Sequence, residues 1–523
     1  MLLAGYLYSF LLVENMADGR EYGGPHGSGL MVFGFGKLLQ TALSACKGEI
    51  FMKMLLVGAG AVGESILRIL KARDCSGEWL KGVVIADYDL ERAKEVAAHL
   101  GNGSRYVPVQ VDAHNRQDLV DLIRKHKCDF VMDAAAPFVS NNIFDAAYEA
   151  GAHYGNMGTW SVPMDNPKLG LGIENSYIEP MTKYNFDRHD AWSKKGIMAC
   201  ICLGIDPGVV NVFAKFAAEY LFDELHEVHV KDGGNLTIPS AGEDDITFGF
   251  NVWTVLDECV NPNVEWDKEQ GGFIVESAFA GEETFEMPAG VGLNTLVKVE
   301  HEETVTMPRY LEQYGLRKCS FKIALDDNLV KALKVINALG LRSLHPINVK
   351  GVSVVPRDVV AAAAPQPKDL GEEMLGKMCV GVHCVGYREG RKREVFIYQP
   401  FDNQLSMHDW KMQAVVMQTG FGAAVAIELI AKGVWKDKGV FAPEYFDPIP
   451  FLKIMDEAGF EYGIVEMESE YKTINDKKIM AQIFAEAEKI NAIIEKKLNS
   501  KELAAFQGLA EMKGEGNVGI KTS

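Results

Sequence analysis

The chain has 523 residues and a formal net charge of −19, from 53 basic and 72 acidic side chains. This length exceeds what one hydrophobic core supports, so two or three domains are expected. Hydrophobic residues make up 48% and charged residues 24%, which is ordinary for a globular protein. The acidic balance disfavours nonspecific binding to nucleic acid or anionic membranes, so neither is expected as a partner.

Residues 1–51 are expected to form a disordered extension or to precede the true start at Met52. Residues 1–13 are apolar, but they are too short to span a bilayer and lack a convincing signal-peptide cleavage site. Residues 18–36 are rich in glycine and have no periodicity. A targeting role for this segment stays open beside the expected cytoplasmic location, and no other segment is expected to cross a membrane.

The nine cysteines are neither dense nor regularly spaced. No pair has Cys or His partners at zinc-finger spacing, so no metal site is predicted. Cys200 and Cys202 lie in an apolar run and are expected to be small buried hydrophobes. Reduced thiols agree with a cytoplasmic protein.

From residue 54 onwards, short apolar strands alternate with amphipathic helices. Strands are predicted at residues 54–57, 82–86, 106–111, 129–133, near 153 and at 197–203, and helices at 61–72, 90–100, 117–125, 143–150 and up to 195. This alternation is typical of a parallel sheet covered on both faces. It predicts an α/β fold, with a doubly wound Rossmann domain over residues 52–205.

After residue 205 the pattern changes to alternating strands. They are predicted at residues 223–231, 273–278, 297–305 and 318–324, with a hairpin of 380–387 and 394–398 and helices at 328–339 and 356–364. This predicts a second, α+β domain over 206–400 with a mostly antiparallel sheet. Residues 401–465 are predicted to return to the first domain through a Gly- and Ala-rich helix at 412–433.

The last segment, residues 466–523, is predicted to be a charged helical tail. Its apolar residues fall on one helical face, at positions 479, 483, 484, 487, 490 and 494. We expect this face to dock on the chain's own body, with a subunit contact as the alternative.

A Gly-x-Gly-x-x-Gly pattern follows the first predicted strand. Gly58 permits a tight turn, Gly60 lets a pyrophosphate approach the backbone, and Gly63 lets the helix pack closely on the strand. The helix then begins at Ala61 and Val62, where free N–H groups and the dipole favour phosphates. Because the strand and the helix are both present, the pattern predicts a dinucleotide site.

Asp87 ends the second predicted strand, about 20 residues past the last glycine, where an acid binds the adenosine ribose. A carboxylate there repels the extra phosphate of NADP, so NAD is predicted and NADP is the alternative. Asp89 is the better candidate for a helix cap.

Further candidates for cofactor contact lie where the third and fourth strands end. Asp112 is predicted to border the adenine. Ala134, Ala135, Ala136 and Pro137 are small residues that suit close approach of a cofactor along the sheet edge. Plain tight packing is the alternative for the alanines.

Several blocks of the chain resemble the saccharopine dehydrogenase family. They are residues 57–63, Asp87, 133–138, 151–154 and 203–211, then 301–303 with 307–308, and 433–444. The block at 203–211 fits the family motif Gly-x-x-Pro-Gly-x-x-Asn. The resemblance covers residues 52–465, whereas Asn156 and Met157 depart from the acid and hydroxyl that many members carry.

The resemblance implies a Rossmann domain, an inserted substrate and dimerisation domain, a homodimer, and chemistry at a carbon–nitrogen bond. Members include saccharopine dehydrogenases, lysine 6-dehydrogenases, and carboxynorspermidine or homospermidine synthases, so the implied substrate is an amino acid or a polyamine. An acid at the position of Asp87 resembles NAD-using lysine 6-dehydrogenase more than NADP-using saccharopine reductases. The block at 301–303 instead resembles carboxynorspermidine- and saccharopine-forming members. The substrate-binding residues implied are Phe138, Tyr154, Pro207, Gly208 and Asn211.

Oxidation of an amine needs a group that takes the nitrogen's proton. Asp206, His301 and Glu302 are the catalytic candidates. The alternatives are a turn or cap role for Asp206 and a solvated acidic strand for the other two. A substrate carboxylate favours a bidentate guanidinium, for which Arg309 is chosen over a surface ion pair.

Two classes of function remain open from the sequence. The first is an NAD-dependent oxidoreductase acting on an amine or imine. The second is a nucleotide-binding regulator that has kept the fold and lost turnover.

Overall fold

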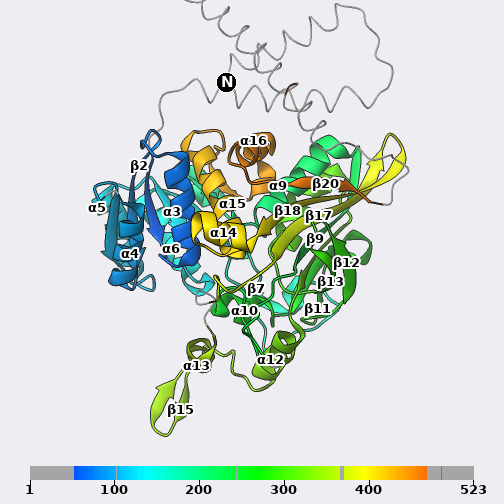
Figure 1. Cartoon of the computed structure of the whole chain (residues 1–523), viewed down its shortest axis with the longest axis horizontal. Helices are drawn as coiled ribbons and strands as arrows, with labels where there is room; N and C mark the ends of the chain where they lie inside the picture. The colour runs from blue at the N-terminus through cyan, green and yellow to red at the C-terminus, as the bar shows by residue number, and fades with distance from the viewer. Residues whose placement is uncertain (1–51, 102, 243–244, 366–369, 468–484, 486–523) are drawn as a thin grey trace, which may run out of the picture. The chain divides into compact units, whose positions relative to one another are not determined.

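The computed structural model describes residues 52–467, apart from 102, 243–244 and 366–369, together with residue 485 (Figure 1). The expectations for residues 1–51 and for the apolar helical face of the tail lie outside the described residues.

Within the described residues, the first sheet has seven parallel strands in the order β19-β8-β5-β4-β1-β2-β3. They are β1 (Met52–Val57), β2 (Leu80–Asp87), β3 (Tyr106–Gln110), β4 (Phe130–Asp133), β5 (His153–Asn156), β8 (Met198–Cys200) and β19 (Gly439–Phe441). The parallel order on both sides of β1 confirms the predicted Rossmann sheet.

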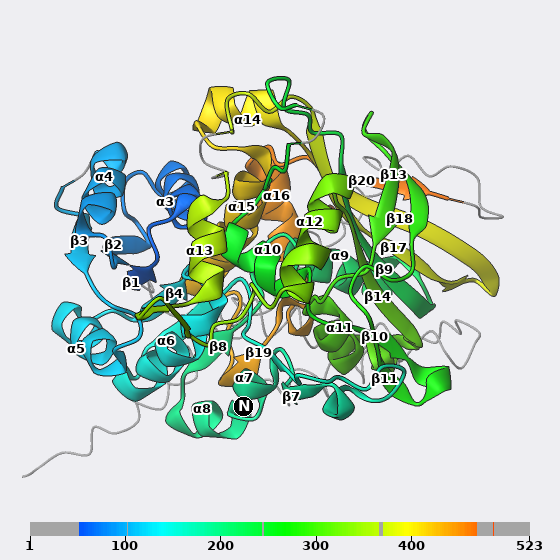
Figure 2. The ribbon, with the colours of Figure 1, turned by 90° about the horizontal axis from the view of Figure 1, so that it is seen from below.

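Helices cover both faces of this sheet. They are α3 (Ala61–Arg73), α4 (Leu90–Leu100), α5 (Arg116–His126), α6 (Pro137–Ala150) and α8 (His189–Lys195). In Figure 2 the strands β1 and β2 lie between α3 and α4 on one side and α5 and α6 on the other. The core on the α5 and α6 side includes Leu119, Ile143, Phe144 and Trp192.

The second sheet has nine strands among the described residues and is mostly antiparallel. They are β9 (Glu224–Gly234), β10 (Asn263–Asp267), β11 (Gly272–Glu276), β12 (Glu283–Met287), β13 (Gly292–Val297), β14 (Lys318–Ala324), β17 (Lys377–Arg388), β18 (Arg391–Asp402) and β20 (Gly463–Glu466). Only the β9 and β14 pair within it is parallel. The predicted hairpin is confirmed, and Glu389 and Gly390 both take positive φ at its turn.

The helices of the second region flank this sheet and the connecting loops. They are α9 (Val209–Phe216), α10 (Val252–Glu258), α11 (Glu303–Leu311), α12 (Asp327–Ala338) and α13 (Pro356–Ala363). The strand predicted over 297–305 is wrong, because β13 ends at Val297 and α11 begins at Glu303. Met307 and Leu311 are buried as α11 packs against β14, so tertiary packing overrides the local alternation.

The segment after residue 402 contributes to both sheets. β19 extends the first sheet beside β8, and β20 extends the second beside β18. Helix α15 (Ala414–Ala431) packs on α3, and a Cβ at Gly420 would lie 1.9 Å from Ser65 Oγ. Contrary to expectation, α15 is long and apolar enough to cross a membrane by composition. However, 89% of that stretch is buried inside the protein, as in a core helix.

Candidate active site

The glycine-rich turn after β1 forms a cradle whose glycines differ in surroundings. A Cβ at Gly58, where φ is 99°, would lie 2.4 Å from the Ala134 carbonyl oxygen. A Cβ at Gly63 would lie 2.1 Å from the Gly58 carbonyl oxygen, whereas one at Gly60 would meet nothing within 4 Å. The turn is therefore tight on two sides and open at Gly60, just before the N-terminus of α3. This geometry fits a pyrophosphate at the predicted place.

Asp87, the last residue of β2, is fixed beside this turn. Its Oδ2 accepts a hydrogen bond from Ala59 N at 2.7 Å, and its Oδ1 accepts one from Asp89 N at 2.9 Å. Asp89 caps α4 by accepting from the backbone N–H of Glu91, as expected. The carboxylate of Asp87 is thus held at the carboxyl end of β2, where a ribose would reach its remaining lone pairs.

Arg92, which belongs to no predicted motif, also contacts the cradle. Its Nε donates to the Ala59 carbonyl at 2.9 Å, and its Nη2 donates to Glu64 Oε2 at 2.5 Å. The guanidinium is therefore already engaged by a carbonyl and a buried carboxylate. No sequence signal marked it, because its partners come from another helix and from the turn.

Beside Asp87, a hollow of about 500 Å³ is lined by Tyr88, Gln110, Val111, Asp112, Asp118 and Leu122. Asp112 is exposed there and accepts from His114 N at 2.9 Å. Hydrogen bonds from the backbone and the side chain of His114 lower the pKa of Asp112. The hollow lies where the sequence analysis expects the adenine, and Asp112 lines it.

The turn after β4 is ordered by a buried carboxylate, Asp133. Its Oδ1 accepts from Ala135 N at 3.0 Å, and its Oδ2 accepts from Ser140 Oγ at 2.6 Å and from Tyr154 Oη at 2.9 Å. Burial raises the pKa of Asp133 to about 6 against these hydrogen bonds. Ala134, Ala135, Ala136 and Pro137 follow it, half-buried at the sheet edge.

Tyr154 and Phe138, two residues that the resemblance implies for substrate binding, differ in how deeply they are buried. Tyr154 is fully buried in the core and donates a hydrogen bond to Asp133, so it orients that carboxylate. Its contact with a substrate stays a prediction. Phe138 is half-buried, and its ring lies 5.9 Å from that of Trp253 on α10 and 6.5 Å from that of Trp160. Phe138 therefore lies where the first region meets the second.

The loop after β8 carries the Gly-x-x-Pro-Gly-x-x-Asn residues. Gly208 has φ of 145°, and a Cβ there would lie 2.0 Å from the Gly204 carbonyl oxygen, so the loop closes tightly on itself. Asn211 is fully buried, accepts from Gly208 N at 2.6 Å and donates to Glu444 Oε1 at 2.6 Å. Pro207 is buried within the loop. The amide of Asn211 thus holds this loop and Glu444, and its contact with a substrate stays a prediction.

Asp206 from this loop lies in what we term the acidic cluster. The cluster consists of Asp206, Asp232 on β9, Glu258 on α10, and Glu300, Glu302 and Glu303 at the start of α11, around His301. His301 Nδ1 and Glu303 Oε2 are 2.7 Å apart, and His301 Nε2 lies 4.0 Å from Glu258 Oε2. The imidazole stacks on Phe321 with ring centroids 3.7 Å apart. Long-range packing thus gathers six carboxylates around one imidazole.

The acidic cluster is held against the carboxyl edge of the Rossmann sheet. Glu302 Oε1 accepts from Thr159 N at 2.5 Å and from Thr159 Oγ1 at 3.1 Å, just after β5. Glu300 Oε2 accepts from Ser161 Oγ at 3.0 Å and from Asn261 Nδ2 at 2.7 Å. Ligands of open parallel sheets bind along this edge, so the cluster faces the region where a bound cofactor ends.

Burial and mutual repulsion change the protonation of the cluster. Burial, with the charge of Asp232 added, raises the pKa of Asp206 well above its usual range. Burial also raises the pKa of Asp232 to about 7 and that of Glu300 to about 7. Burial by itself lowers the pKa of His301. The negative charges of Glu303, Glu258 and Asp206 have the larger effect and raise this pKa well above 6.5. Near neutral pH the cluster can therefore exchange protons.

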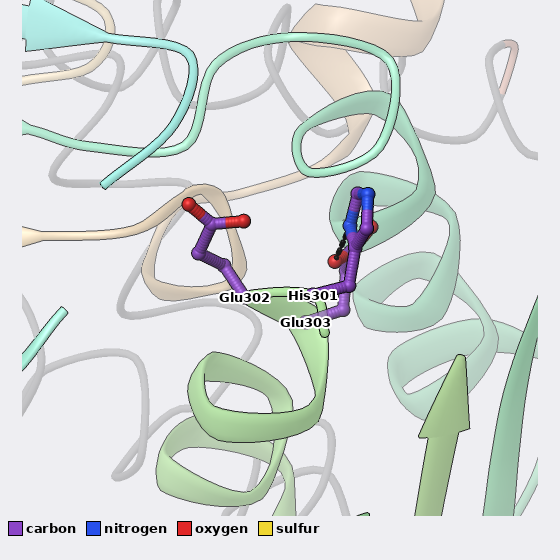
Figure 3. Close-up of side chains that lie close together, drawn as sticks. All are labelled: His301, Glu302 and Glu303. Atoms are coloured by element: carbon purple, nitrogen blue, oxygen red, sulfur yellow. Dashed lines mark hydrogen bonds and ion pairs between the residues drawn. The ribbon is translucent and has the colours of Figure 1, made fainter. Parts of the chain in front are cut away.

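Several cluster oxygens have no hydrogen-bond partner among the described residues. They are Asp206 Oδ2, Asp232 Oδ1, Glu300 Oε1 and Glu303 Oε1. Buried acceptors without a donor are costly, and carboxylates most of all. Figure 3 shows the Glu302 carboxylate turned away from the His301 and Glu303 pair. Even so, a ring nitrogen of His301 and one carboxylate oxygen each of Glu302 and Glu303 lie within 4.8 Å of one another. These oxygens can accept hydrogen bonds from an ammonium group of a ligand.

Arg309 lies outside the acidic cluster. It is exposed on α11, and its guanidinium carbon lies 4.1 Å from the centre of the Phe186 ring. It lies eight residues beyond His301 in the chain, and its role in binding a substrate carboxylate stays a prediction. Asn156, which departs from the family pattern, accepts from Cys202 N at 2.9 Å and fixes the end of β8.

A dinucleotide cradle at one end of a parallel sheet, with buried proton-exchanging groups at the same edge, defines a nicotinamide-dependent oxidoreductase. Residues 54–200 match the saccharopine dehydrogenase NADP binding domain, and residues 204–460 match the saccharopine dehydrogenase C-terminal domain. The chain belongs to the saccharopine dehydrogenase family and is an NAD(P)-dependent oxidoreductase of that type.

The chain matches two curated relatives over nearly their whole length. The chain is 29% identical over 427 residues to carboxynorspermidine synthase of Vibrio cholerae, covering 80% of this chain and 98% of that protein. It is 25% identical over 418 residues to carboxyaminopropylagmatine dehydrogenase of Synechocystis sp., covering 78% and 96%. The fold is similar to apo saccharopine dehydrogenase (L-Glu forming) from Saccharomyces cerevisiae, with a TM-score of 0.55, 14% identity, and coverage of 80% and 100%.

Proposed function

We propose that the protein transfers a hydride between NAD and the carbon of a carbon–nitrogen bond in a carboxylated polyamine. The observation that carries this proposal is the acidic cluster. A polyamine brings several ammonium groups, and the cluster offers several buried carboxylates, four of them with an oxygen that lacks a partner among the described residues. The names of both curated relatives point to carboxylated amines of this kind.

Charge also favours a polyamine over saccharopine or another substrate rich in carboxylates. Asp232, Glu258 and Glu303 surround the single cation of the cluster, His301. A carboxylate brought into this set of like charges would be repelled, whereas an ammonium would satisfy the free acceptors. The finer expectations, a homodimer and a cytoplasmic location, remain part of the proposal.

The chain's own residues suit the proton transfer that such a reaction needs. The bound dinucleotide would be held by Gly58, Gly60, Gly63 and Asp87, and it supplies the acceptor or donor of the hydride. When the amine is oxidised, its carbon loses a hydride and its nitrogen loses a proton. We assign that proton to His301, which Glu303 orients through the 2.7 Å hydrogen bond. Asp206 and Asp232 hold the substrate ammonium groups beside it.

Replacing Asp87 with alanine is expected to weaken NAD binding by about 10- to 100-fold, because charge-assisted hydrogen bonds to the ribose are worth about 1.5–3 kcal/mol. The same change should cost NADP less, since it removes the repulsion of the 2′-phosphate. Fluorescence titration with NADH and NADPH measures both constants. Asp121→Ala, at an exposed acid on α5 outside the hollow, is the matched control. Equal loss for both cofactors would contradict the NAD assignment.

The function itself is tested by cofactor reduction at 340 nm with a substrate panel. We expect turnover with NAD and carboxynorspermidine, and at least about 100-fold lower kcat/KM with lysine or saccharopine, as expected when buried carboxylates lack an ammonium partner. NADP should support a lower rate. Binding of NAD without turnover of any amine in the panel would count for the non-catalytic regulator instead.

A further inference from the structure

A second groove lies next to the acidic cluster and carries the opposite charge. It encloses about 370 Å³ between residues 164–169, the segment after β11 and helix α12. Lys334 on α12 and Arg342 beyond it bring two positive charges to its lining, and Asp165 brings one negative charge. Ser277 and Asn337 add polar groups, while Phe279 supplies an apolar wall.

Neither cation of this groove forms an ion pair with a described residue. Arg342 Nη1 donates to the side-chain oxygen of Asn261 at 2.5 Å, which is a neutral partner. Lys334 Nζ lies 5.4 Å from the centre of the Phe279 ring. Nearby Arg357, by contrast, is paired with Asp257 at 2.5 Å. A half-buried guanidinium without a carboxylate is suited to bind one from a ligand, because its fork matches the carboxylate oxygens.

The groove is connected to the acidic cluster through one side chain. Asn261 accepts from Arg342 through Oδ1 and donates through Nδ2 to Glu300 Oε2 at 2.7 Å. Glu300 also accepts from Ser161 Oγ at 3.0 Å, at the sheet edge. A single buried amide therefore separates the cation in the groove from a carboxylate of the cluster. One extended molecule with ammonium groups and a carboxylate can contact both.

We propose that this groove is the carboxylate subsite of the substrate, with Arg342 as its principal ligand and Lys334 as its second. The inference rests on the proposed function, because it takes the amine chain to lie in the acidic cluster. It assigns the carboxylate recognition that the sequence analysis sought at Arg309. It also explains how one site accepts a zwitterion, since the two charges bind at separate places.

The test compares two ligands that differ in the carboxylate. Equilibrium binding of carboxynorspermidine and of norspermidine is measured by calorimetry for the wild type, Arg342→Met and Lys334→Met, with NADH present. Arg342→Met should weaken carboxynorspermidine binding by about 10- to 100-fold and norspermidine binding by less than about 3-fold. Lys334→Met should show the same pattern with a smaller loss. Arg317→Met and Lys331→Met, both exposed and outside the groove, should leave both ligands unchanged.

The outcomes separate this inference from the function on which it rests. If norspermidine binds and Arg342→Met affects both ligands equally, the groove assignment is overturned while the polyamine function stands. If neither polyamine binds the wild type, the proposed function fails. A third arm uses succinate as probe. Succinate that binds the wild type, not Arg342→Met, and does not compete with carboxynorspermidine would mean a separate carboxylate ligand and overturn the substrate assignment.

Discussion

Replacing His301 with asparagine is expected to lower kcat by about 100- to 10,000-fold, the range typical of losing a positioned proton-transfer group. The imidazole is buried, stacks on Phe321 and hydrogen-bonds Glu303, so it is held where a proton must leave the substrate nitrogen. Steady-state rates at saturating NAD and amine measure the change. His408→Asn, at an exposed histidine on the surface, is the matched control and should retain full activity.

The pH profile distinguishes a proton-transfer role from a structural one. In the wild type, the rate of amine oxidation should rise with pH as the cluster gives up its protons, and this limb should vanish in His301→Asn. Glu303→Gln should shift the limb to lower pH, because a neighbouring charge that raises the pKa of His301 is lost. If the pH profile of His301→Asn keeps the wild-type limb, whatever its absolute rate, the proton belongs to another group. Asp206 is then the next candidate.

Replacing Asp232 with asparagine is expected to stabilise the ligand-free protein at pH 8 while weakening polyamine binding. Burial raises the pKa of Asp232 from 3.8 to about 7, so the folded protein binds this proton more tightly than the unfolded chain. That contribution to stability is full below about pH 4 and is lost as pH rises through about 7. The cost of the ionised carboxylate at pH 8 is on the order of 2–4 kcal/mol, which asparagine avoids.

Thermal unfolding between pH 5 and pH 8 measures the first effect. The wild type should lose stability with rising pH, and Asp232→Asn should lose less, with the smallest difference between the two proteins at pH 5. Calorimetry should show polyamine binding at least about 30-fold weaker in the variant, since a buried charge partner is removed. Glu286→Gln, on the exposed side of β12, controls for net charge. Equal slopes in wild type and variant would refute the buried-charge account.

The cofactor half of the site could be predicted from the sequence because its contacts are local. Gly58, Gly60 and Gly63 lie in one turn, and Asp87 follows at a spacing that the strand–helix–strand unit fixes. Each glycine has surroundings that agree with its predicted role. The parallel sheet with helices on both faces also followed from the alternation of strands and helices.

The substrate half could be predicted only in part because its residues converge through long-range packing. His301, Glu302 and Asp206 were selected by motif, but nothing local marks Asp232 on β9 or Glu258 on α10. The wrong strand over 297–305 hid the fact that Glu300 and Glu303 are buried rather than solvated.

Tyr154 and Asn211 were selected from family blocks, whereas Arg309 was selected for its charge. The first two are fully buried and hydrogen-bond other protein groups, so packing determines their role. Arg309 is exposed on α11 and contacts the Phe186 ring, eight residues beyond His301 in the chain. Arg342 carried no signal, because its importance comes from the groove and from Asn261.

The most direct test of the central claim follows the hydride. Carboxynorspermidine with deuterium on the carbons bonded to its secondary nitrogen is incubated with the protein and NAD, and the reduced cofactor is analysed by mass spectrometry. The account predicts that NADH gains a single deuterium, and that it does so far more slowly with His301→Asn. Reduced cofactor without deuterium, or no reduction while NAD and the polyamine are both bound, would contradict it.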